Sequence, residues 1–154
     1  MSSQIERDSF HESGHAVVAI LLGIPIDGAG LSPGEHRGGW LKFTSLDCQQ
    51  DAVVIAGKAG RIAECFFDSS ASHKPRSQDE KIIWLTVAGR MGSLSPEFQE
   101  DYFRCAELEA ERLVAKHWGT IAALAAELIL KRTLTGEAAT AFVKQRLPAR
   151  QPDE

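Results

Sequence analysis

The feature that most constrains the fold is the segment DSFHESGHAVVAILLG, residues 8–23, in which His11, Glu12 and His15 stand directly before an apolar run. Histidines four residues apart lie on the same face of an α-helix, about one turn from each other. Residues 16–22 are all apolar, so we expect protein to surround this helix on all sides. The chain must then bury two imidazoles and a carboxylate, and buried groups of this kind need hydrogen bonds or a metal ion.

Length and composition indicate one globular domain with a proper core. The chain has 154 residues, of which 44% are hydrophobic, and a formal net charge of −4. It contains no dense Lys/Arg run, so a nucleic-acid partner is not expected. Its three cysteines are far apart and odd in number, which is typical of reduced thiols in a reducing compartment: Cys48, Cys65 and Cys105. The longest apolar run is far below the ~18 residues of a membrane span. With no signal-peptide core in residues 1–10, the expected location is the cytoplasm.

Almost every long segment has helical periodicity, so we predict a mainly α, single-domain bundle of about six helices. A small sheet of two to three strands is inserted after the first helix. The helices are predicted at about 5–22, 47–67, 77–91, 95–119, 120–132 and 135–147, and the strands around 28–32 and 39–44. The predicted N-caps are Asp47, Ser77, Ser95, Thr120 and Thr135, and the segment from residue 68 to 77 is predicted as a loop. We expect the domain to cover residues 1–147 and residues 148–154 to form a flexible tail.

The second predicted helix is rich in small residues. Gly57 and Gly60 both lie inside it, among several alanines. Each glycine in a helix interior costs about 1 kcal/mol relative to alanine. We therefore expect another backbone to pack very closely against this helix.

The spacing of the histidines indicates metal chemistry. On one helical face, His11 and His15 can reach a single tetrahedral ion, and Glu12 lies beside them to take a proton from water, which is the H-E-x-x-H arrangement. The alternative is a pair of histidines hydrogen-bonded within the core. Zinc also needs a third protein ligand. The metzincin pattern does not supply one, because it requires Gly and His where this chain has Val18 and Leu21.

Three residues remain as candidates for the third ligand. Glu64 and Asp68 form E-x-x-x-D, the spacing that gluzincins use for a ligand and a supporting carboxylate. Asp79 stands in the first turn of the predicted third helix, and His73 lies in the loop before it. Each also has a simpler interpretation: Glu64 as a surface charge, Asp79 as a favourable charge at a helix N-terminus, and His73 as a solvated side chain.

Four stretches together resemble the peptidase domain of the FtsH-type ATP-dependent zinc metallopeptidases. They are FHESGHAVVA, AGKAGRIAE, SQDEKIIWLTVAGRMG and LAAELILKRTLTGEAATAF, and they span about residues 5–145 in the family's order. The resemblance implies that Asp79 is the third zinc ligand and that Glu64 supports the site from behind or is structural. It also implies that a substrate strand can be added to an edge strand near Gly39–Thr44.

The resemblance implies a zinc metalloendopeptidase. The family's membrane spans and ATPase are not found in this sequence, which has no G-x-x-x-x-G-K-[ST] loop. We therefore expect it to cleave unfolded polypeptides or peptides, or to work with a separate ATPase partner. Members of that family form six-membered rings, so a homo-oligomer is kept as an alternative to a monomer. One alternative is a non-catalytic relic of the fold that binds partners or peptides, and another is a hydrolase of non-peptide substrates.

Overall fold

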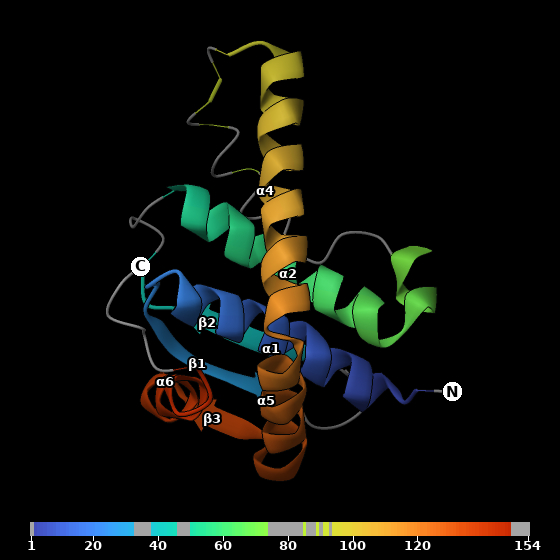
Figure 1. The fold of residues 1–154 in the computed structure, drawn as a ribbon, viewed down its shortest axis with the longest axis vertical. Coiled ribbons are helices and arrows are strands. Elements are labelled where there is room, and N and C mark those ends of the chain that lie inside the picture. The colour runs from blue at the N-terminus through green and yellow to red at the C-terminus, as the bar shows by residue number, and fades with distance from the viewer. Residues whose placement is uncertain are drawn as a thin grey trace.

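The structure is a computed structural model that describes residues 2–32, 38–45, 50–73, 85, 89, 91–92 and 94–148. Within these residues it contains five α-helices, one short 3₁₀ helix and one three-stranded sheet. The predicted fold class, a mainly helical bundle with a small sheet after the first helix, is confirmed (Figure 1).

Helix α1 (Gln4–Leu21) carries the H-E-x-x-H segment and matches its prediction closely. A capping box starts it: the Ser3 side chain accepts a hydrogen bond from the Glu6 N–H, and the Glu6 carboxylate accepts one from the Ser3 N–H at 2.7 Å. Gly23, with φ of 74°, ends the helix in a left-handed conformation that suits glycine. Local residues at both ends thus fix the length of the helix.

The second half of α1 is the centre of the molecule. Residues 16–19 are four successive apolar residues with no exposed surface, so this part of the helix is buried on every side. Helix α2, helix α5 and the sheet pack around it (Figure 1). The expectation that protein surrounds this helix is confirmed.

The sheet is antiparallel, with strand order β2-β1-β3. Strands β1 (Ile26–Leu31) and β2 (Gly39–Phe43) match the two predicted strands and pair with each other as an antiparallel hairpin. Strand β3 (Thr133–Thr135) was not predicted, and its Leu134 pairs with Ala29 of β1. It follows directly after α5, so the C-terminal part of the chain closes one edge of the sheet.

An indole ring braces the outer face of the hairpin. Trp40 of β2 pairs with Gly30 of β1 and lies over Gly28 and Gly30, close enough that a Cβ at Gly30 would come within 2.8 Å of the ring. An aromatic side chain on a neighbouring strand commonly compensates for strand glycines in this way. The ring of the outer strand β2 therefore covers two glycines of the central strand β1.

Helix α2 (Gln50–Phe67) ends where predicted. Its expected cap, Asp47, lies outside the described residues. The segment after it, predicted as a loop, contains the 3₁₀ helix η1 (Ser69–His73). Of the helix predicted over residues 77–91, the structure describes little more than Leu85 and Gly89, both helical.

The C-terminal half consists of α4 (Pro96–Lys116), α5 (Trp118–Lys131) and α6 (Gly136–Lys144). The predicted caps of α4 and α6 are confirmed, because the Ser95 and Thr135 side chains accept hydrogen bonds from N–H groups three residues on, at 3.2 and 3.1 Å. Local capping residues again mark where helices begin.

The predicted break at Gly119, with Thr120 as a cap, is wrong. The chain turns at His117, and α5 begins at Trp118. The His117 N–H still bonds the Leu113 carbonyl, and the His117 carbonyl accepts from Ile121 at 3.0 Å, so Gly119 and Thr120 lie inside the first turn of α5. Helical hydrogen bonding therefore continues through both residues.

Within the described ranges, no single helix is long and apolar enough to span a membrane. Helices α4 and α5 reach the length and apolar content of a membrane span only when taken together, and the two are bent by 78° where they meet.

The small residues of α2 do admit a close neighbour, as expected. A Cβ on Gly14 of α1 would lie 2.6 Å from the Ala59 carbonyl oxygen and 2.6 Å from the Ala63 Cβ. Gly60 has a different neighbour, since a Cβ there would come within 2.6 Å of the His15 ring. Close packing of the two helices thus depends on a glycine from each.

Candidate metal centre

Helix α1 brings the two histidines of the motif together. The Nε2 atoms of His11 and His15 lie 3.1 Å apart, with the rings nearly perpendicular at 77°. Two nitrogens bound to one tetrahedral zinc ion at about 2.0–2.1 Å would be separated by roughly 3.3 Å. The spacing of the Nε2 pair therefore fits a shared metal ion.

The other nitrogen of His15 is anchored to α2. Its Nδ1 lies 2.8 Å from the Ala56 carbonyl oxygen, which can only accept a hydrogen bond, so Nδ1 carries the proton and Nε2 keeps its lone pair. The pKa of His15 is lowered from 6.5 to about 3, first by burial and then by the neighbouring His11, while the hydrogen bond to the Ala56 carbonyl opposes the shift. His15 is therefore neutral, which is the state that binds a metal.

The second nitrogen of His11 is held by a carboxylate. Its Nδ1 lies 3.1 Å from Oε2 of Glu64, and the side chains of both residues are largely buried. A carboxylate that accepts from one imidazole nitrogen orients the ring and makes the other nitrogen a stronger ligand. Glu64 thus lies on the far side of the His11 ring from the Nε2 pair.

These anchors leave two Nε2 lone pairs facing each other. Two lone pairs at 3.1 Å repel unless a positive charge lies between them, and a proton or a metal ion can supply it. Metal-binding histidines generally donate their second ring N–H to a carboxylate or a backbone carbonyl, and each of these rings has one such partner. The donor set therefore fits a metal ion.

The proposed catalytic carboxylate is buried against the start of strand β2. Glu12 of α1 is 3% exposed, and its side chain packs against Gly39, the first residue of β2. A Cβ on Gly39 would come 2.7 Å from Glu12 Oε1 and 2.8 Å from its Cδ. The carboxylate is thus held directly beneath the start of the hairpin's second strand.

The third ligand is not settled by the described residues. Asp79 lies outside them, as does the side chain of His73. In the part of the chain that is described, no group of three or more His, Cys, Asp or Glu side chains is arranged to hold a metal ion. Asp68, expected to accompany Glu64, instead binds Arg7 at 3.3 Å and the Ser2 hydroxyl.

Strand β2 offers an open edge next to Glu12. Among the described residues its one partner strand is β1. The Ser32 N–H donates to the Gly38 carbonyl at 2.7 Å, and antiparallel pairs alternate between hydrogen-bonded and non-hydrogen-bonded. The N–H and C=O groups of Gly39 and Leu41 therefore point away from β1. An extended peptide could bond to them.

The sequence analysis named Glu64 but missed three other contributors to this centre: the Ala56 carbonyl, Gly60 and Gly39. The Ala56 carbonyl, Gly60 and Glu64 follow one another at intervals of four along α2 and so share the face toward the histidines. That spacing was a usable signal. Gly39 gave no such signal, because its contact with Glu12 joins two segments through the fold.

No protein-family model matches the chain, and no curated protein matches its sequence at a significant level.

Proposed function

We propose that this chain is a zinc metalloendopeptidase of the FtsH peptidase type that cleaves unfolded polypeptides or peptides in the cytoplasm. The observation that carries the proposal is the convergence of the His11 and His15 Nε2 atoms at 3.1 Å, with each ring anchored through its Nδ1. Glu12, which follows His11 on the same helix and is buried against Gly39, is the proposed base.

His11 and His15 would hold the zinc ion through Nε2, and Asp79 is the proposed third ligand. When bound, zinc supplies a Lewis acid that acidifies water and polarises the scissile carbonyl. Glu64 and the Ala56 carbonyl keep the two rings in the ligand tautomer. These contacts prepare both histidines before any ion arrives.

The chain's own residues account for substrate binding and proton transfer. An extended peptide pairs with the N–H and C=O groups of Gly39 and Leu41 at the open edge of β2. Glu12 takes a proton from the attacking water as the new C–O bond forms, and passes it to the amine nitrogen as the C–N bond breaks. A low local dielectric around the buried carboxylate strengthens its interactions during this transfer.

The test is cleavage of unfolded casein and of labelled peptides by the zinc-loaded protein and by Glu12→Gln. We expect the variant to keep its zinc and to lose at least about 100-fold in rate. Glu111→Gln, an exposed carboxylate on α4, is the matched control and should cleave like the wild type. Activity in Glu12→Gln equal to that of the wild type would rule out this mechanism. Peptide binding without cleavage by the zinc-loaded wild type would favour the non-catalytic alternative.

A further inference from the structure

Two adjacent glycines at the start of β2 have different surroundings. A Cβ on Gly38 would meet no atom within 4 Å. A Cβ on Gly39 would collide with Cγ, Cδ and Oε1 of Glu12, the last at 2.7 Å. Neither glycine has a positive φ, so alanine is acceptable to the backbone at both positions. The difference between them is therefore steric, and it concerns Glu12.

Glu12 has little room to avoid such a collision. The residue is 3% exposed and belongs to a helix that is packed against α2, α5 and the sheet. Any side chain at position 39 would have to push either the carboxylate or the strand.

Gly39 also belongs to the open edge. Its N–H and C=O groups point away from β1, while its Cα lies against Glu12. A single residue thus connects the position of a paired peptide with the position of the base.

We infer that Gly39 is a positioning residue for Glu12: its missing side chain lets the carboxylate lie directly beneath the edge where a peptide is paired. The inference rests on the proposed function. Displacing a catalytic group by about 1 Å can reduce a rate roughly 100-fold even when the group itself is intact. Position 39 thereby controls catalysis through the placement of Glu12.

The experiment compares Gly39→Ala with Gly38→Ala in the zinc-loaded protein. We expect Gly39→Ala to lower kcat about 100-fold with KM and zinc content unchanged, because the paired backbone groups and both histidines stay in place. Gly38→Ala should match the wild type in all three. A kcat near the wild-type value in Gly39→Ala would overturn the inference.

A second measurement does not depend on peptidase activity. Gly39→Ala should lower the urea midpoint of unfolding in the wild-type background. It should have no such effect in Glu12→Ala, which lacks the Cγ, Cδ and Oε1 atoms that collide. If Gly39→Ala alone does not fold, folding of the Gly39→Ala/Glu12→Ala protein supports the contact. An equal loss in both backgrounds would refute it. If the wild type cleaves nothing, the proposed function fails and this cycle alone decides the role of Gly39.

Discussion

Helix α2 packs against α1 on one side and against α4 on the other, and the two interfaces are built differently. Toward α1, contact is made by backbone and small side chains: Gly14 lies against the Ala59 carbonyl, and the His15 ring lies over Gly60. Adding one methyl group to either glycine creates an overlap. This interface confines the His15 imidazole, because the ring lies directly against Gly60.

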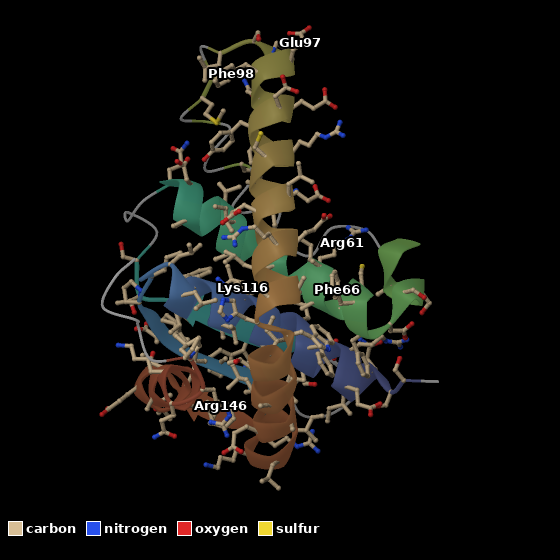
Figure 2. The ribbon with its side chains drawn as sticks, viewed as in Figure 1. Arg61, Phe66, Glu97, Phe98, Lys116 and Arg146 are labelled. Atoms are coloured by element: carbon tan, nitrogen blue, oxygen red, sulfur yellow. The ribbon has the colours of Figure 1, made fainter. Side chains whose placement is uncertain are left out.

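Toward α4, longer polar side chains join the two helices in addition to the buried apolar residues of α4, among them Phe103 and Ala110. Tyr102 donates a hydrogen bond to Asp51, and Lys58 pairs with Glu107 at 3.8 Å. These groups can change rotamer without moving either backbone. Farther out, α4 extends away from the sheet, with Glu97 and Phe98 near its tip (Figure 2). A single helix can therefore make close backbone contacts on the side of the candidate site and carry adjustable polar pairs on the opposite side.

The largest effect is expected at the α1–α2 interface. Gly14→Ala should destabilise the protein by about 1–3 kcal/mol through overpacking, although alanine is the better helix former by about 1 kcal/mol. Urea denaturation measures this. The matched control is Gly119→Ala in the first turn of α5, where a Cβ meets nothing within 4 Å and a small gain is expected. Shifts of the same sign in both variants would contradict the comparison.

The next effect concerns the ligand support on the same face of α2. Glu64→Gln keeps the shape of the side chain but removes the charge that orients His11, so zinc affinity should fall by about 10–100-fold. Competition with a chromophoric chelator measures the affinity, and Glu111→Gln serves as the control. A far larger loss would make Glu64 a direct ligand, and no loss would remove it from the site.

On the α4 side, Tyr102 gives a pH-dependent test. Burial, followed by its hydrogen bond to Asp51, raises the pKa of Tyr102 to about 12. The folded state therefore holds the proton more tightly than the unfolded state does. The resulting stability is complete below pH ~10 and is lost as the pH rises through about 12.

Tyr102 is the one tyrosine in the sequence, so ultraviolet absorbance titration reports its ionisation alone. Asp51→Asn should shift the titration toward the ordinary value of about 10. An unshifted midpoint in that variant would mean that Asp51 has no part in raising the pKa. Tyr102→Phe should lose about 1 kcal/mol of stability at neutral pH.

The smallest effect is expected for the ion pair between α2 and α4. Glu107 is half exposed, and exposed pairs generally contribute less than about 1 kcal/mol. Glu107→Gln should change the unfolding free energy by about 0.5 kcal/mol or less, and added salt should remove that difference. A loss comparable to that of Gly14→Ala would show that the two faces of α2 are not different in kind.

Local signals predicted much of the fold. Helix α1, the end of α2 and the caps at Ser95 and Thr135 depend on residues within one turn of each other, and all were found as expected. Strand β3 was missed because its three residues are extended only through pairing with β1, about 100 residues earlier. The α4–α5 break was misplaced because Gly119, a frequent helix breaker, is tolerated inside a first turn.

The same distinction between local sequence signals and tertiary contacts applies to the candidate site. The spacing of His11, Glu12 and His15 specifies their common location on one helix. The structure brings the two imidazoles together and buries Glu12 against Gly39. Their partners come from other elements: the Ala56 carbonyl has no side-chain signature, and Gly39 reaches Glu12 only once the hairpin has folded onto α1. Contacts of this second kind depend on tertiary packing, which local sequence patterns do not encode.

Trp40 gives the proposed peptide site an intrinsic optical probe. Its indole is 39% exposed, rests on Gly28 and Gly30, and belongs to the strand that would receive a peptide. The emission of a partly exposed indole depends on how much water surrounds it. In a variant in which Trp84 and Trp118 are replaced by phenylalanine, a change in tryptophan fluorescence would report strand addition directly, without a label and before any bond is cleaved.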